Sequence, residues 1–89
     1  MKFKKRPIEV DAIRFDSGDV NEVVEFLGYI PSMNFNGTGE PQEIVIETAE
    51  GNMTAIRGDW IVREPFPTQD RRFYPCKPDI FEQTHEEAP

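Results

Sequence analysis

One stretch of the sequence, residues 71–85, gathers many of the side chains that could do chemistry. It reads RRFYPCKPDIFEQTH and contains the single cysteine, Cys76, and the single histidine, His85. A nucleophilic cysteine needs a lowered pKa, which a helix N-terminus, a nearby cation or a histidine base can supply. Cys76 precedes a predicted helix and adjoins Lys77, but His85 lies next to the EEAP residues at the C-terminus, where a base would be poorly positioned. A lone cysteine in a short domain is most often a small buried hydrophobe, so the sequence predicts no enzyme.

Basic and aromatic residues between positions 57 and 77 form a second group of candidates. Guanidinium groups bind phosphate or carboxylate through a fixed fork, and aromatic rings can stack a nucleotide base. Because these residues lie on adjacent predicted strands and their turns, we expect them to gather at one rim and hold a small, nucleotide-like anion. The candidate ligand-binding residues are Arg57, Trp60, Arg63, Arg71, Arg72, Tyr74 and Lys77.

The same residues have structural interpretations, which the sequence leaves open. The arginines could neutralise acidic elements in a chain with 17 acidic residues, and Lys77 could simply project into solvent. Trp60 begins a predicted strand, where a large ring usually joins the core. Gly58 and Asp59 are assigned to a structural turn, because an aspartate that follows a glycine accepts backbone hydrogen bonds there.

Composition and charge exclude several classes of function. The net charge is −7, and residues 9–50 carry ten acidic residues against one basic residue, Arg14. Such a chain is a poor nucleic-acid binder, since phosphate neutralisation dominates that affinity. One cysteine, one histidine and scattered acids do not supply a metal site, and no cofactor is expected. A single cysteine fits a reducing compartment, and the absence of a signal peptide or a long apolar run predicts a cytoplasmic protein without membrane contact.

The first half of the chain predicts a strand, a helix and a long loop. Apolar and polar residues alternate from Ile8 through Ala12, and a change of phase at Ile13 and Phe15 indicates a bulge or a strand end with two buried faces. Residues 19 and 22 form a capping box before a helical stripe, Val20, Val23, Val24 and Leu27, which ends at Gly28. Residues 29–42 lack periodicity; Tyr29, Met33 and Phe35 in this loop could fold onto the core or cover a pocket.

The second half predicts mostly strands. Residues 43–48 alternate cleanly, and a turn at 49–52 returns the chain as a hairpin. After the turn at Gly58 and Asp59, a third strand follows, then a proline-bounded loop at 65–70 and a short edge strand at 71–75. A C-terminal helix begins near Pro78, with Ile80, Phe81 and Thr84 facing inward. Residues 1–89 therefore predict one α+β domain, a small antiparallel sheet in the order β-α-β-β-β-β-α with helices packed on it.

Three segments together resemble a family of small bacteriophage and prophage proteins. These are KKRPIEVDAIRF at the start, IVIETAEGNMTAIRGDW in the centre and RRFYPCKPDIFEQTHE near the end, so the resemblance covers nearly the whole chain. Arg57 stands where that family usually has proline, and Arg71–Arg72 where it tends to have glycine–glutamate. The resemblance implies a phage source and a role in the cytoplasm of the host cell, but no particular reaction.

Three hypotheses from different classes follow. The first is a non-enzymatic binding module that acts on a host protein through its acidic face or sequesters a small anionic ligand. The second is a virion assembly protein that self-associates through an exposed edge strand as a homo-oligomer. The third is a small enzyme that uses Cys76 with His85.

Overall fold

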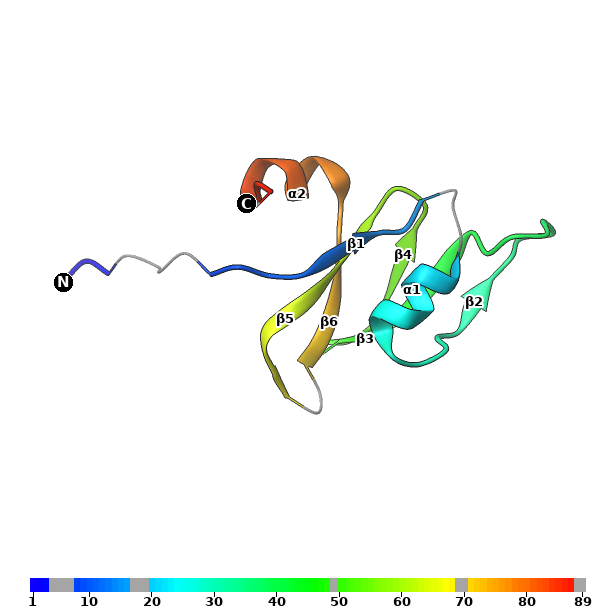
Figure 1. The fold of residues 1–89 in the computed structure, drawn as a ribbon, viewed down its shortest axis with the longest axis horizontal. Coiled ribbons are helices and arrows are strands. Elements are labelled where there is room, and N and C mark those ends of the chain that lie inside the picture. Colours follow the sequence, from blue (N-terminus) through cyan, green and yellow to red (C-terminus); the bar gives the residue numbers. More distant parts are fainter. Residues whose placement is uncertain (4–7, 17–19, 49, 69–70, 88–89) are drawn as a thin grey trace.

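Two small antiparallel sheets and two helices make up the fold (Figure 1). The structure, a computed structural model, describes residues 1–3, 8–16, 20–48, 50–68 and 71–87. The elements are β1 (Ala12–Arg14), α1 (Val20–Leu27), β2 (Met33–Asn34), β3 (Glu43–Thr48), β4 (Gly51–Ile56), β5 (Trp60–Thr68), β6 (Arg71–Cys76) and α2 (Pro78–Thr84). The predicted α+β class is confirmed.

The strands divide into two sheets where the sequence predicts one. β1, β5 and β6 pair in the order β1-β5-β6, and β2, β3 and β4 pair in the order β2-β3-β4. The extra strand, β2, lies inside the loop predicted at 29–42 and pairs Met33 with Ile44 and Asn34 with Glu43. Two residues are too few to give a periodic signal, so β2 could not be recognised from the sequence.

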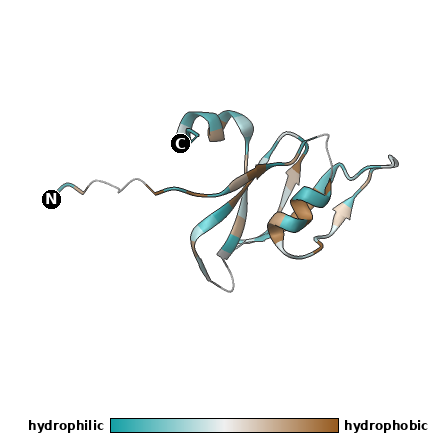
Figure 2. Cartoon of the chain, in the orientation of Figure 1, coloured by the Kyte–Doolittle hydropathy of each residue, from teal (hydrophilic) through white to brown (hydrophobic). Residues whose placement is uncertain are grey.

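Helix α1 follows the prediction closely. Its stripe buries Val23 and Leu27, and the helix ends at Gly28, whose φ is +80° and whose N–H donates to Val24 O at 2.9 Å. An isolated helix of this length is marginal in water, so burial of the stripe is what stabilises it. Figure 2 shows hydrophobic and hydrophilic residues together on this short helix. The capping residue predicted at position 19 lies outside the described residues.

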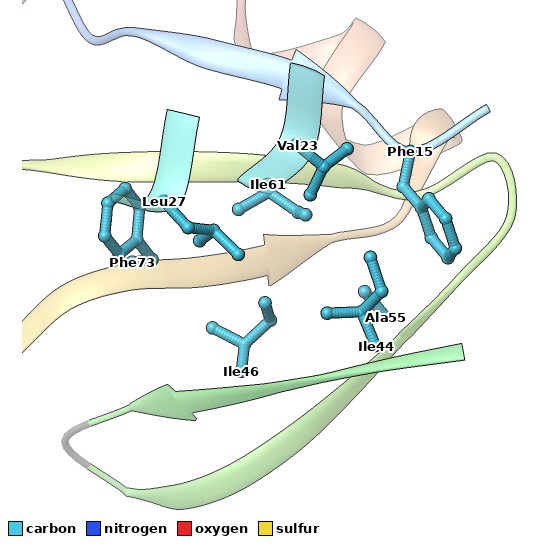
Figure 3. Packing of buried hydrophobic residues seen from close by; sticks show 8 residues of the cluster. All are labelled: Phe15, Val23, Leu27, Ile44, Ile46, Ala55, Ile61 and Phe73. Carbon is cyan, nitrogen blue, oxygen red and sulfur yellow. The ribbon is translucent and has the colours of Figure 1, made fainter. Parts of the chain in front are cut away.

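The core lies between α1, the β3–β4 hairpin and the β5–β6 pair. Ile44, Ile46 and Ile61 are fully buried and meet the side chains of Val23 and Leu27 (Figure 3). Burial of each such side chain contributes about 1.5–3 kcal/mol relative to exposure. The remaining members of the buried cluster are Phe15, Ala55 and Phe73.

The first strand begins later than the sequence predicts. β1 covers only Ala12–Arg14, paired with Trp60, Ile61 and Val62 of β5, and Ile8 is 46% exposed. The segment with the change of phase is the part that finds a partner strand, and it leads to Phe15, which is buried. The strand therefore forms where the chain lies beside β5, and the alternation that starts at Ile8 does not determine its start.

Two further boundaries differ from the prediction in the second half. β5 runs on through Thr68, so residues 65–68 are strand rather than loop, with an irregular register between Arg63 and Thr68. Pro65 and Pro67 fall in that irregular stretch, where no ladder hydrogen bond is lost. In α2, Ile80 is 51% exposed and Thr84 is also exposed, contrary to the expected inward face, and Phe81 alone makes the contact, with Trp60.

The turn between β4 and β5 is fixed by Asp59, which is 2% exposed. Its Oδ2 accepts the N–H of Ile56 at 3.0 Å, the type of backbone hydrogen bond expected of a turn aspartate. Lys77 Nζ donates to Oδ1 at 3.2 Å and to Oδ2 at 3.0 Å. Gly58, at φ +98°, donates its N–H to Phe15 O, and Phe15 N–H donates to Asp59 O. The turn thus joins the end of β4, the end of β1 and the residue after β6.

Removal of the Asp59 carboxylate should destabilise the whole domain. We expect Asp59→Ala to lower the free energy of unfolding by about 2–3 kcal/mol, because a partly buried N–H and an ammonium lose their charged acceptor. Lys77→Ala should cost less, since the Lys77 side chain is 53% exposed and water can replace it. Urea denaturation measures both values.

Glu82→Ala provides the control, because Glu82 is an exposed carboxylate on α2. Surface substitutions of this kind usually change stability by less than about 0.5 kcal/mol. An Asp59→Ala variant as stable as Glu82→Ala would contradict the structural role of the turn.

Candidate functional site

The basic side chains predicted to share one rim lie instead at separate places. Each described side chain contacts its own partner, and for Arg57, Arg63 and Lys77 that partner lies far away in the sequence. Among the side chains that the structure describes, the expected common anion site is therefore not formed. The side chain of Arg71 lies outside the described part of the structure, and the others are Arg57, Arg63, Arg72 and Lys77.

Arg63 connects β5 to the end of α1 and to the segment before β1. Its Nη1 donates to Asp11 Oδ2 at 3.2 Å and its Nη2 donates to Phe26 O at 3.2 Å. The guanidinium also lies 4.7 Å from the centroid of the Phe26 ring. A cation that binds the carbonyl groups in the last turn of a helix stabilises that helix. Arg63 is thus engaged as a structural cation.

Lys77 and Arg72 are also engaged elsewhere. Lys77 binds the buried Asp59 carboxylate, and the guanidinium of Arg72 lies 5.5 Å from the centroid of the Tyr29 ring. Tyr29 has its pKa raised by burial and by the charge of Glu47, whereas Arg72 acts in the opposite direction. Arg72 is exposed and adjoins this ring.

Of the two predicted aromatic residues, Trp60 has a ring partner within the protein. Trp60 stacks on Phe81 with ring centroids 4.2 Å apart, and Phe81 stacks in turn on His85 at 4.4 Å. The indole N–H of Trp60 is buried and finds no hydrogen-bond acceptor among the described atoms. Tyr74 has its pKa raised by burial and then by Glu64 and Cys76. Among the described cation–ring contacts, none joins Trp60 or Tyr74 to an arginine of the predicted set.

Cys76 lies in surroundings that oppose ionisation. Burial raises the pKa of the thiol, and the negative charges of Asp59 and Asp79 raise it further. A nucleophilic cysteine requires the opposite environment. His85 is engaged with the Phe81 ring, and its Nδ1 lies 2.8 Å from Thr84 Oγ1. The geometry gives Cys76 no imidazole base among its described contacts.

Arg57 borders a hollow. The hollow has a volume of about 260 Å³ and mostly apolar walls. Arg57 Nη1 donates to Asp16 O at 2.6 Å, and its Nη2 donates to Glu40 Oε2 at 3.2 Å. The guanidinium also lies 5.3 Å from the centroid of the Phe15 ring, and the Arg57 side chain is 20% exposed. The lining residues are Val20, Met33, Phe35, Gly39, Glu40, Pro41 and Arg57.

Sequence reasoning found Arg57 but not the rest of this hollow. The long loop at 29–42 was the available signal, since Met33 and Phe35 were expected to fold onto the core or cover a pocket, and both line the hollow. Glu40 and Pro41 carry no such pattern. Their position depends on the pairing of β2 with β3, which brings the two ends of the loop together.

No protein-family model, curated protein or solved structure matches the chain. Within the described residues, no helix is long and apolar enough to cross a membrane. The same part of the chain holds no cluster of three or more His, Cys, Asp or Glu side chains arranged for a metal ion. The site is therefore described by its own geometry.

The raised pKa of Cys76 gives a measurable consequence. Iodoacetamide labels the thiolate, so we expect labelling of the folded protein at pH 8 to be slower than labelling of the urea-unfolded chain. The pH midpoint of labelling should also be higher when the protein is folded, because burial and the nearby carboxylates favour the neutral thiol. Mass spectrometry over a pH series follows both rates.

The sign of the associated stability change follows from the same shift. A thiol whose pKa is higher in the folded state contributes stability below the unfolded pKa, and this contribution is lost as the pH rises through the folded value. Fast labelling of the folded protein with a midpoint below that of the unfolded chain would contradict the assignment.

Proposed function

We propose that the protein is a non-catalytic binding module that holds a small anion with an apolar portion in the hollow beside Arg57. The resemblance to small phage proteins supports an accessory role in the cytoplasm of an infected host cell. The supporting observation is that Arg57 lines a hollow together with Met33, Phe35 and Pro41. The ligand is again a small anion, as the sequence predicts, but one guanidinium binds it instead of several cations at a common rim.

The Arg57 guanidinium is held in place before any ligand arrives. Asp16 O accepts from Nη1, and the Phe15 ring, which is buried, lies beside the guanidinium. A side chain fixed in its bound position loses little conformational entropy on binding. Its planar fork suits a carboxylate or a phosphate group, while Met33, Phe35 and Pro41 offer apolar contact.

Glu40 is the group that a ligand would replace. Its side chain is 66% exposed and contacts Nη2 of Arg57. Ion pairs with such exposed partners contribute only about 0–1 kcal/mol, so a ligand carboxylate can take the place of Glu40 at small cost. Glu40 then acts as a built-in competitor, and its charge also repels an incoming anion.

The size of the hollow limits the ligand. Pockets for drug-sized molecules are usually about 300–1,000 Å³, and this hollow is about 260 Å³. We therefore favour an anion smaller than a dinucleotide, such as an aromatic acid or an aliphatic acid longer than acetate. The apolar walls favour such an acid over inorganic phosphate or acetate.

Titration with phenylacetate, followed by NMR chemical shifts, tests this proposal. We expect resonances of Met33, Phe35 and Arg57 to respond to phenylacetate more than to acetate or inorganic phosphate. Arg57→Gln should abolish the response. Glu40→Gln should strengthen phenylacetate binding by up to about fivefold, the value of a surface ion pair of up to about 1 kcal/mol.

The matched control is Arg72→Gln, which removes an exposed arginine beside Tyr29 instead of one beside the hollow. Binding should be unchanged in this variant. Because Glu40→Gln is expected to bind more tightly, that result cannot come from misfolding. Weaker binding by Glu40→Gln, or loss of binding in Arg72→Gln alone, would place the anion elsewhere and overturn the proposal.

A further inference from the structure

Strand β4 presents one unpaired edge. In the described part of the fold, β3 pairs with one side of β4 and no strand pairs with the other. Val45 N–H donates to Ser32 O, on the β2 side of β3, so the backbone groups of Ile44 and Ile46 point toward β4. Their partners in the register are Ala55 and Met53. In an antiparallel ladder the alternate residues point the other way, so Asn52, Thr54 and Ile56 direct their N–H and C=O groups to the open edge.

Only the middle of this edge is free to accept another strand. At one end, Asp59 takes both groups of Ile56: its Oδ2 accepts the Ile56 N–H, and its own N–H donates to Ile56 O. At the other end, the N–H of Glu50 donates to Thr48 Oγ1. The backbone groups of Asn52 and Thr54 have no described partner inside the chain. A strand that adds here has two residues with which to form ladder bonds.

The edge also lacks the devices that usually prevent strand addition. Charged residues, prolines and bulges commonly protect an exposed edge, and Gly51–Ile56 contains no charged residue or proline and pairs with β3 in a regular register. Met53 is 43% exposed and Ile56 is 46% exposed. Apolar side chains therefore accompany the free backbone groups.

We propose that β4 pairs antiparallel with β4 of a second copy of this chain, about a two-fold axis at Met53. This register places Asn52 opposite Thr54 of the partner and Thr54 opposite Asn52 of the partner. Each pair exchanges two N–H···O bonds, and Met53 faces its own copy as a non-hydrogen-bonded pair. Neighbouring two-fold registers would call on Ile56, whose N–H and C=O are both bonded, or on Glu50, whose N–H is bonded. The result is a continuous sheet of six strands, β2-β3-β4 from each copy.

Charge does not oppose a second copy at this edge. The chain carries a net charge of −7, so two copies repel each other overall, but β4 contains no charged residue. In the proposed register, Met53 faces Met53, Ala55 faces Gly51 and Ile56 faces Glu50, so no like charges stand opposite each other. Glu47 of the two copies would lie about three strand spacings apart, roughly 14 Å, which is beyond the screening length at physiological salt. An isologous contact of this kind closes with two chains.

Disulfide trapping tests both the pairing and its register. In a Cys76→Ser background, Met53→Cys should form a disulfide-linked dimer on mild oxidation, because a non-hydrogen-bonded pair brings the two Cα atoms to about 4.5 Å. Thr54→Cys is the matched control on the same edge. Its two copies are offset by two residues, about 8 Å apart, which is too far for a disulfide. We expect at least about tenfold more cross-linked dimer from Met53→Cys than from Thr54→Cys.

Sedimentation equilibrium of the unsubstituted chain gives a second measurement. A mass near twice 10.3 kDa is expected at high concentration, and Thr54→Lys should shift the equilibrium toward monomer by adding a charge to the edge. Ile80→Lys is the control, since Ile80 is 51% exposed on α2. Equal cross-linking of the two cysteine variants, a monomer at every concentration, or a dimer that survives Thr54→Lys and dissociates in Ile80→Lys would overturn the proposal.

Discussion

The buried carboxylate of Asp59 is the constraint on which the rest of the structure depends. A charge at 2% exposure is costly unless it is paired and hydrogen-bonded, and here a lysine and a backbone N–H meet that requirement. The partners come from distant parts of the chain, since Ile56 ends β4 and Lys77 follows β6. Main-chain bonds of Phe15 with Gly58 and Asp59 add the end of β1. The Asp59 side chain therefore fixes the β4–β5 turn, where the chain passes from one sheet to the other.

This use of charge explains why the cations are dispersed. In a small domain with little core, each long basic side chain is more useful as a tie between elements than as part of an open site. Arg63 joins α1 to the segment before β1, and Lys77 joins β6 to the β4–β5 turn. Arg57 also has internal partners, yet its remaining contact, with Glu40, is exposed. At the proposed ligand site, Arg57 thus keeps one contact, its ion pair with Glu40, that a ligand can replace.

The helices and hairpins formed by neighbouring residues could be predicted from the sequence, whereas the pairing of distant strands and the positions of the cations could not. Periodicity located α1 with its end at Gly28, and the hairpin of β3 and β4, because burial of a stripe or a face imposes 3.6-residue or two-residue repeats. The division into two sheets depends on pairings between distant strands, and β2 is too short to have a period. The common rim of the described cations was wrong for a related reason. The expectation relied on neighbouring strands and turns, but where each cation lies depends on a partner distant in sequence, such as Asp11 for Arg63 and Asp59 for Lys77.

The stack of Trp60, Phe81 and His85 has a consequence for the C-terminal helix. α2 contains no buried residue, and Figure 1 shows it apart from α1, so this column of rings is its principal described attachment. Segments with few buried contacts open at lower free energy than the core. Trp60 is the single tryptophan of the chain. Its fluorescence will therefore respond to undocking of α2 as well as to loss of the sheets. A melting curve recorded by tryptophan fluorescence alone will show the release of α2 before it shows the unfolding of the two sheets.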